Sequence, residues 1–314
     1  MKIIFMGTPD FAVPCLEGIL KDPNHEVVGV FTQPDRRKGR GKKMQGTPVK
    51  ILAQKENIPV YQPEKLNTEK AYEELKNIGA DIFVVVAYGQ ILSKKILELP
   101  PYGAVNVHAS LLPKYRGAAP IHWAVIHGEK ETGITTMQMD EGLDTGDMLL
   151  QQSIPINEGE TTGDLHDRLA LLGKTLLLET LNKLEEKSIQ PIPQGEDESS
   201  YAPKISKALG EIDWKASARE IHNLIRGLHP FPGAWTHYQG RILKLHEARW
   251  IKGDHARAPG TILEASREGI LVATGRDLIQ IITLQPSGKK SMGVGEFLAG
   301  NKIEVHEKLG AMDE

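Results

Sequence analysis

The residues best placed to do chemistry are Asn106 and His108, which stand two positions apart in the stretch Ala104–His108. On a β-strand, residues two apart project from the same face, so Val105 and Val107 would point the other way, into apolar packing. A strand inside a parallel sheet is normally apolar on both faces, so polar groups there must find partners or carry a function. The spacing leaves two interpretations open, a functional pair or a pair that bonds to neighbouring loops.

An acidic loop at residues 139–147 (Met-Asp-Glu-Gly-Leu-Asp-Thr-Gly-Asp) contains four carboxylates and two glycines. This composition fits either a surface turn or a cation site. No histidine or cysteine joins the carboxylates, so a transition-metal site is not expected, and we predict that the protein requires no metal. If the loop folds beside the end of the Ala104–His108 strand, Asp144 is able to orient the imidazole of His108.

An α/β fold must position these residues. Helical segments alternate with short apolar runs that are typical of strands, at 2–6, 27–32, 81–88, 104–108, 133–139 and 148–156. This alternation predicts a Rossmann-like open parallel sheet with right-handed crossovers. Ligands of such sheets bind beyond the carboxyl ends of the strands, which is where His108 would lie.

Two Thr-Pro pairs, Thr8-Pro9 and Thr47-Pro48, predict helix starts, because threonine caps a helix well and proline suits the first turn. The first pair follows Gly7 and a predicted strand, as in dinucleotide-binding proteins. The segment Gly7–Ala12 has one glycine where that fingerprint needs three, so a dehydrogenase is not favoured.

The composition changes near residue 190. With 314 residues the chain is longer than one core usually serves, so two domains are expected. Residues 190–200 are rich in Pro, Gln, Glu and Ser, which is typical of a linker. Beyond one helix at about 216–228, short strands at 241–250, 261–265, 270–274 and 278–284 predict a small β-barrel. We therefore predict an N-terminal domain (1–189), a linker (190–206) and a C-terminal domain (207–314).

The composition also restricts where the protein works. Hydrophobic residues make up 40% and charged residues 25%, as in ordinary globular proteins. Cys15 is the only cysteine, which excludes an intrachain disulfide. No apolar run approaches the roughly 20 residues needed to cross a bilayer. We expect a cytoplasmic protein without a membrane partner.

Two motifs occur together in this chain, Asn106-x-His108 followed by Ser110-Leu111-Leu112-Pro113, and Gly142-Leu143-Asp144-Thr145-Gly146. With these motifs at this spacing, the chain resembles the folate-dependent formyltransferases. The other similar segments are Gly7–Ala12, Gln33-Pro34-Asp35 with the basic run after it, Tyr115–Pro120 and Met137–Asp140. The resemblance covers essentially the full length and is closest to the members that act on initiator methionyl-tRNA.

The resemblance implies that 10-formyltetrahydrofolate donates the formyl group and that Asn106, His108 and Asp144 are catalytic. It places Ser110–Pro113 against the carrier and the turn at 90–92 along the pterin pocket. The donor-binding residues are then Ser110, Leu111, Leu112, Pro113, Gln90, Ile91 and Leu92. A purely structural role for Ile91 and Leu92, as anchors of a turn, stays open. For the C-terminal domain the resemblance implies an OB-like barrel that binds tRNA, and we expect a monomer.

A basic stretch between residues 35 and 50 has seven basic residues against the single acid Asp35. The basic residues are Arg36, Arg37, Lys38, Arg40, Lys42, Lys43 and Lys50. On composition alone such a run is a solvated loop. Beside a transferase site it suggests contact with the phosphates of a tRNA acceptor stem. The resemblance places Arg40, Lys42 and Lys43 at that contact.

Three other functions stay open. A formyltransferase acting on a sugar-nucleotide amine would share the catalytic residues but would not need the basic stretch. A glycinamide ribonucleotide formyltransferase would leave the second domain unexplained. A non-catalytic tRNA-binding protein would leave Asn106 and His108 without a purpose.

Overall fold

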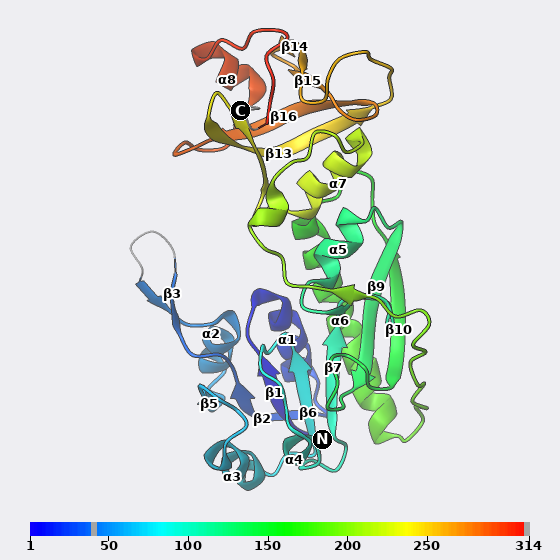
Figure 1. The fold of residues 1–314 in the computed structure, drawn as a ribbon. Helices are drawn as coiled ribbons and strands as arrows, with labels where there is room; N and C mark the ends of the chain where they lie inside the picture. The colour runs from blue at the N-terminus through cyan, green and yellow to red at the C-terminus, as the bar shows by residue number, and fades with distance from the viewer. Residues whose placement is uncertain (39–42, 311–314) are drawn as a thin grey trace. The chain divides into compact units, whose positions relative to one another are not determined.

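A computed structural model describes residues 1–38 and 43–310, and the chain forms two compact units (Figure 1). The first unit comprises Met1–Ala118, Thr132–Ile154 and His166–Ala202. The second comprises Ala119–Glu131, Pro155–Leu165 and Pro203–Glu314. Two internal segments of the chain therefore group with the C-terminal residues. The predicted division into catalytic domain, linker and tRNA-binding domain concerns function and stays a prediction.

The first unit is built on a seven-stranded sheet with the order β10-β9-β7-β6-β1-β2-β5. The strands are β1 (Lys2–Gly7), β2 (Glu26–Phe31), β5 (Val60–Tyr61), β6 (Ile82–Val86), β7 (Ala104–His108), β9 (Glu131–Gln138) and β10 (Met148–Pro155). β1 pairs in parallel with β2 and β6, and β6 pairs in parallel with β7. All five residues of β6 are buried, as expected of an apolar strand at the centre of a parallel sheet. The predicted α/β class is confirmed.

β9 departs from the predicted parallel arrangement because it runs antiparallel to β7. Gln138, at the end of β9, pairs with Val105 near the start of β7, and Thr135 pairs with His108. The acidic loop that follows β9 therefore begins at the opposite end of β7 from His108. To bring Asp144 to the imidazole, this loop must fold back along β7.

The helical elements of the first unit are η1 (Asp10–Ala12), α1 (Val13–Lys21), α2 (Pro48–Lys55), α3 (Glu69–Ile78), α4 (Lys94–Leu97) and α6 (Thr162–Glu185), whose first turn is assigned to the second unit. The predicted start of α2 is confirmed, because the Thr47 hydroxyl accepts a hydrogen bond from the Lys50 backbone N–H at 3.1 Å. The start predicted at Thr8 is wrong, since α1 begins at Val13. The Thr8 hydroxyl instead donates to the carbonyl O of Tyr88 at 2.8 Å, so a tertiary contact uses the capping group.

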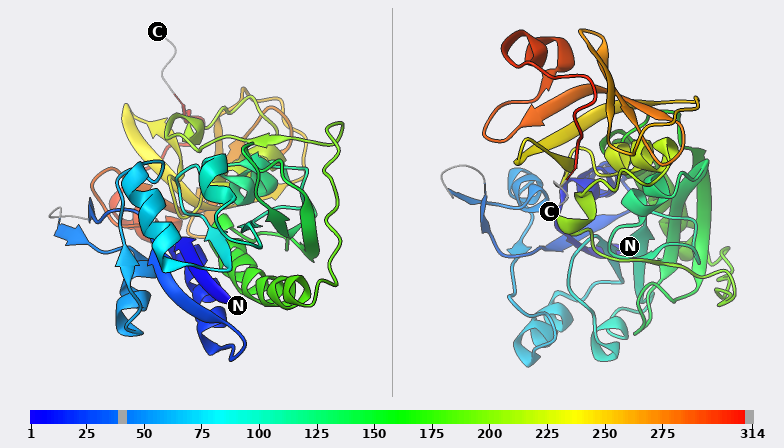
Figure 2. Two further views of the ribbon diagram at one scale, coloured as in Figure 1. Left: turned by 90° about the horizontal axis from the view of Figure 1, so that it is seen from below. Right: turned by 45° about the horizontal axis from the view of Figure 1, so that its top comes forward.

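Two small strand pairs complete the first unit. β3 (Arg36–Lys38) and β4 (Lys43–Gln45) form an antiparallel pair that extends away from the large sheet (Figures 1 and 2). β8 (Arg116–Gly117) pairs in parallel with β11 (Tyr201–Ala202), which lies in the segment predicted as a linker. The linker prediction therefore missed a strand that is paired within the first unit.

The second unit is β-rich, as predicted from its short strands. Its elements are α5 (Pro120–Ile126), η2 (Ala208–Gly210), α7 (Ala218–Gly227), β12 (Ala234–Tyr238), β13 (Arg241–Ile251), β14 (Ile262–Ser266), β15 (Gly269–Ala273), β16 (Leu278–Pro286), β17 (Met292–Gly293) and α8 (Val294–Gly300). The antiparallel sheet has the order β12-β13-β16-β15-β14, and β17 pairs with β16. α7 starts with a capping box between Ser217 and Glu220 and buries Ile221 and Ile225 in the core of this unit.

Within residues 1–38 and 43–310, no helix is both long enough and apolar enough to span a bilayer. In the same part of the chain, no three His, Cys, Asp or Glu side chains gather in a way that could hold a metal ion.

Candidate active site

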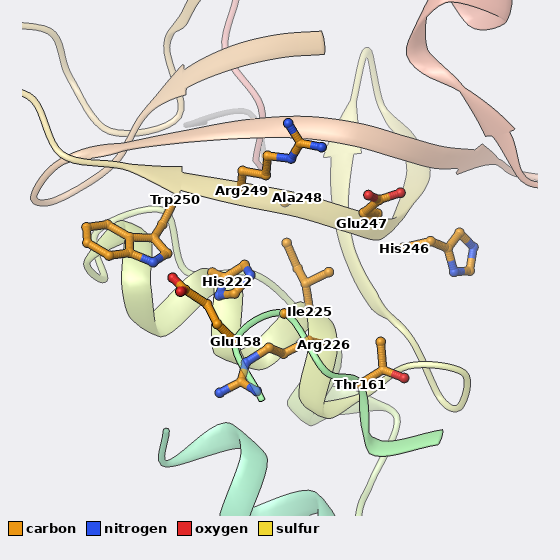
Figure 3. A pocket seen from close by; sticks show the side chains of 11 residues that line it. Glu158, Thr161, His222, Ile225, Arg226, His246, Glu247, Ala248, Arg249 and Trp250 are labelled. Atoms are coloured by element: carbon orange, nitrogen blue, oxygen red, sulfur yellow. The ribbon is translucent and has the colours of Figure 1, made fainter. Parts of the chain in front are cut away.

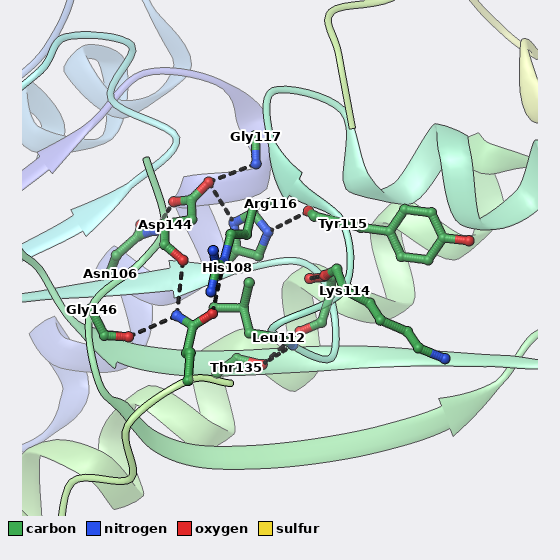
Figure 4. A network of polar contacts seen from close by, with 12 residues as sticks. Asn106, His108, Leu112, Lys114, Tyr115, Arg116, Gly117, Thr135, Asp144 and Gly146 are labelled. Atoms are coloured by element: carbon green, nitrogen blue, oxygen red, sulfur yellow. Dashed lines mark hydrogen bonds and ion pairs between the residues drawn. The ribbon is translucent and has the colours of Figure 1, made fainter. Parts of the chain in front are cut away.

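The structure brings Asn106, His108 and Asp144 together (Figure 4). The side-chain amide of Asn106 donates to Asp144 Oδ1 at 3.4 Å. His108 Nδ1 lies 3.7 Å from Asp144 Oδ2. One carboxylate therefore contacts both side chains that β7 projects from the same face.

His108 is almost fully buried, with 6% of its side chain exposed. Its Nε2 lies 2.9 Å from the carbonyl O of Tyr115. Because a carbonyl oxygen only accepts hydrogen bonds, Nε2 must carry a proton in this contact. The other ring nitrogen faces the Asp144 carboxylate.

The Asp144 carboxylate is held from a second side by β8. The backbone N–H of Gly117 donates to Asp144 Oδ2 at 2.8 Å. Only 15% of the Asp144 side chain is exposed. With partners on both sides, the carboxylate is fixed in one orientation before any ligand arrives.

The acidic loop reaches His108 by a tight turn back along β7. Asp144 has a φ of +54°, a left-handed conformation that costs a residue with a Cβ roughly 1 kcal/mol or more. Gly146 passes so close to β9 that a Cβ there would clash with the carbonyl O of Gln138. Asp140 stabilises the turn, since its carboxylate accepts from the Thr145 hydroxyl at 2.8 Å. Asp140 and the close approach at Gly146 thus support a turn that presents Asp144.

This arrangement suits the stabilisation of a developing negative charge. An amide NH₂ has two N–H donors, and Asn106 directs one of them at Asp144, which leaves the second for a ligand. A donor fixed in advance where charge develops is effective because it needs no reorganisation during the reaction.

The predicted donor-binding residues at 110–113 follow β7 directly and are held by hydrogen bonds. Ser110 is fully buried, and its hydroxyl donates to the carbonyl O of Lys114 at 2.6 Å. The Leu112 N–H donates to the Thr135 hydroxyl at 3.1 Å. Leu111 and Pro113 are half-buried. These contacts fix the backbone beside the cluster, while the binding role of Ser110, Leu111, Leu112 and Pro113 stays a prediction.

In the turn Gln90-Ile91-Leu92, the first and last side chains contact the protein and the middle one is exposed. The Gln90 side chain accepts from the Leu66 N–H at 2.7 Å and donates to the carbonyl O of Pro63 at 3.0 Å. Leu92 is 2% exposed and packs in the core of the first unit. Ile91 is 75% exposed, so its side chain is the one available to a ligand.

Of the predicted tRNA-binding residues, Arg40 and Lys42 lie outside the described residues, and Lys43 is the first residue of β4. Lys50, at the end of the basic stretch, donates to Asp35 Oδ2 at 2.6 Å. That hydrogen bond lowers the pKa of the Asp35 carboxyl below its usual value. The charge of Lys50 is therefore neutralised locally.

A separate cavity of about 360 Å³ lies in the second unit, between α7, β13 and residues 158–161 (Figure 3). The side chains of His222, Glu158 and Trp250 line it. Burial and the nearby charge of Arg226 lower the pKa of His222 to about 4.

Comparison with known proteins accounts for both units. Residues 1–181 match the profile of the formyl transferase family, and residues 204–302 match that of the formyl transferase C-terminal domain. Over 310 residues the chain is 54% identical to the methionyl-tRNA formyltransferase of Alkaliphilus oremlandii, which covers 99% of this chain and all of that protein. The chain belongs to the methionyl-tRNA formyltransferase family.

Another methionyl-tRNA formyltransferase, from Clostridium novyi, is 50% identical over 98% of this chain and all of its own length. Among solved structures, the sugar 3N-formyl transferase WlaRD, crystallised with dTDP and 5-N-formyl-THF, has a TM-score of 0.68 at 22% identity and covers 92% of this chain and 99% of its own. HypX from Aquifex aeolicus, in complex with tetrahydrofolic acid, has a TM-score of 0.65 at 18% identity over 98% of this chain and 50% of its own. At these identities the similarity of the two structures is one of fold.

Sequence reasoning missed three residues that hold His108, Asp144 and the acidic loop of this formyltransferase in place: Tyr115, Gly117 and Gln194. Tyr115 and Gly117 act through backbone atoms, which a residue type does not reveal. They do lie in Tyr115–Pro120, one of the segments that carried the family resemblance. Gln194 lies in the stretch predicted as a linker, and no sequence motif there indicated a contact with the site.

Proposed function

We propose that the protein transfers the formyl group of 10-formyltetrahydrofolate to the amino group of initiator methionyl-tRNA, in the cytoplasm. The observation that carries this proposal is the convergence of Asn106, His108 and Asp144 beside β7, in a chain similar over its full length to methionyl-tRNA formyltransferases. Formylated initiator tRNA then serves translation initiation.

The reaction exchanges one carbon–nitrogen bond for another. The neutral amine of the methionyl group attacks the formyl carbon, and the carbonyl electron pair moves onto the formyl oxygen. The tetrahedral intermediate collapses when its bond to the folate nitrogen breaks. A proton leaves the attacking amine, and a proton reaches the departing folate nitrogen.

The three side chains match the charges in this sequence. Asn106 donates to the formyl oxygen as it becomes negative. A protonated His108 also donates to it once its Nε2–H turns from the Tyr115 carbonyl O to the ligand. One such donor is typically worth roughly 10²–10³ in rate. Asp144 holds the imidazole in position and stabilises its cation. His108, Asp144 or a bound water relays the proton, which adds about 10²–10⁴ in rate.

Binding of the two substrates is assigned to different parts of the first unit. Residues 110–113 and the turn at Gln90–Leu92 receive the folate, with the exposed Ile91 as its apolar contact. The basic residues Arg40, Lys42 and Lys43 contact phosphates of the acceptor stem. The protein acts as a monomer. Its second unit is the tRNA-binding domain and provides further contacts to the tRNA.

The decisive experiment offers 10-formyltetrahydrofolate with three acceptors in separate reactions: methionyl-tRNA, an aminosugar nucleotide and glycinamide ribonucleotide. We expect formylation of methionyl-tRNA alone. Formylation of the sugar nucleotide instead would assign the chain to the sugar-nucleotide enzymes. Tight tRNA binding without formylation of any acceptor would identify a non-catalytic tRNA-binding protein.

A further inference from the structure

Gln194 lies in the stretch predicted as a linker, yet its side chain is bonded to the acidic loop. Its Nε2 donates to the carbonyl O of Asp144 at 2.8 Å and to the carbonyl O of Gly146 at 2.7 Å. Two peptide carbonyls on either side of Thr145 therefore converge on one amide. A side-chain NH₂ has two N–H donors and can satisfy both carbonyls at once.

The other end of the Gln194 amide is held by β8. Gln194 Oε1 accepts from Arg116 Nε at 3.0 Å, and Arg116 Nη1 is paired with Glu196 at 3.3 Å. Arg116 stands between the two residues whose backbone atoms contact the site, Tyr115 at His108 and Gly117 at Asp144. Gln194 thus connects the acidic loop to the strand that holds both His108 and Asp144.

The loop needs such a support because Asp144 has a left-handed backbone. A residue with a Cβ keeps a φ of +54° only when its surroundings hold it there. If the carbonyls of Asp144 and Gly146 lose their common donor, the peptide planes that carry them, 144–145 and 146–147, can rotate. The carboxylate would then move relative to Asn106 and His108, although neither of those side chains had changed.

We propose that Gln194 is a positioning residue, which holds the turn at residues 144–146 so that the Asp144 carboxylate meets Asn106 and His108. This inference rests on the proposed function, because it acts through the role of Asp144 in formyl transfer. Among the described residues, no hydrogen bond joins Gln194 to Asn106 or to His108.

The test is a Gln194→Met substitution, which keeps the length of the side chain and removes its donors and its acceptor. We expect kcat for formylation of methionyl-tRNA to fall about 10- to 100-fold, because small displacements of reacting groups have effects of that size, with little change in either KM. Gln190→Met is the matched control, since Gln190 lies in the same stretch with an exposed side chain, and its kcat should equal that of the unmodified protein. If Gln194→Met disturbs packing, Gln194→Glu keeps the shape and the acceptor but lacks the NH₂, and it should lose kcat as well.

A double-mutant cycle separates positioning from general destabilisation. In an Asp144→Asn background, the further change Gln194→Met should have almost no effect, because the group that it positions is already impaired. Unchanged kcat in Gln194→Met, or an equally large loss in both backgrounds, would overturn the proposal. Near-normal kcat in Asp144→Asn alone would instead refute the role of Asp144, and with it the proposed mechanism.

Discussion

Two histidines, His108 in the first unit and His222 in the second, have opposite surroundings. His108 has an oxygen at each ring nitrogen, the Tyr115 carbonyl at 2.9 Å and the Asp144 carboxylate at 3.7 Å. His222 lines a cavity beside the guanidinium of Arg226, and among the described residues its ring makes no hydrogen bond. The second environment favours a neutral imidazole.

Burial of the His222 ring is the larger cause of its lowered pKa, and the charge of Arg226 adds to it. The Arg226 guanidinium is itself fixed, donating to Asn223 Oδ1 at 2.9 Å and to the carbonyl O of Glu160 at 3.1 Å. A cation that cannot move away from His222 opposes its protonation. The comparison predicts that the first histidine matters for turnover and the second for stability.

The largest effect should come from His108. His108→Gln removes the ring that we propose as a donor to the formyl oxygen, so we expect turnover of methionyl-tRNA to fall roughly 10²–10³-fold. Asn106→Ala and Asp144→Ala should each cause losses of similar size. Formylation is measured with saturating folate and tRNA, and circular dichroism checks that each variant is folded.

His222→Gln is the matched control for this first prediction, because it removes a histidine from the second unit. Its turnover should equal that of the unmodified protein. Near-normal turnover in a folded His108→Gln protein would remove the main distinction between the two histidines.

The second prediction concerns stability and pH. His222 has a pKa of about 4 in the folded protein, below its unfolded value of 6.5. Between these values the unfolded state binds more protons, so the free energy of unfolding must fall as pH decreases from 6.5 to 4. At pH 5 the contribution of His222 should lower the free energy of unfolding by about 2 kcal/mol relative to pH 7.

Tryptophan fluorescence measures this loss selectively, because all four tryptophans, Trp123, Trp214, Trp235 and Trp250, lie in the second unit. Urea unfolding at pH 7 and pH 5 gives the free energy of unfolding. In His222→Gln the difference between the two pH values should shrink by the amount lost through His222. An unchanged difference would mean that His222 is not held neutral by its surroundings.

The third prediction tests whether the basic stretch supplies the charge for tRNA. Each phosphate contact adds about 0.9 to the steepness with which log affinity falls against log salt concentration. If two contacts are lost, the decrease in affinity between 50 and 200 mM salt should therefore be about tenfold smaller. Arg40→Ala combined with Lys42→Ala should show this flatter dependence in a filter-binding assay. Lys70→Ala, an exposed lysine on α3, should leave the slope unchanged. Equal slopes for all three proteins would place the tRNA elsewhere.

Sequence reasoning worked where one local signal decided the outcome. The continuous apolar run within 81–88 predicted a buried strand, which is β6, and Thr47-Pro48 predicted the start of α2. The same Thr-Pro signal was wrong at Thr8, because the hydroxyl there bonds to Tyr88, a residue far away in the chain. Local chemistry cannot reveal that competition.

The candidate site shows the same limit. Asn106 and His108 could be placed on one face from their spacing alone, and the family resemblance added Asp144. The antiparallel direction of β9 could not be inferred, since strand direction depends on pairing rather than on residue types. The role of 190–202 was also hidden, because its contacts with the acidic loop involve one glutamine side chain, and its pairing with β8 involves backbone atoms.

The smallest effect is expected at Ile91, where the two halves of the Gln90–Leu92 turn can be separated. Ile91→Ser removes an exposed apolar side chain, so stability should be unchanged. The KM for 10-formyltetrahydrofolate should rise about fivefold, because part of one apolar contact to the folate is lost. Leu92→Ala is the contrasting variant, since Leu92 is buried in the core and its truncation should cost about 2–5 kcal/mol of stability. Steady-state kinetics and thermal unfolding of the two proteins distinguish a ligand contact from a core anchor. If Ile91→Ser leaves the folate KM unchanged, the turn serves only the fold, and the apolar contact to the folate must come from another segment.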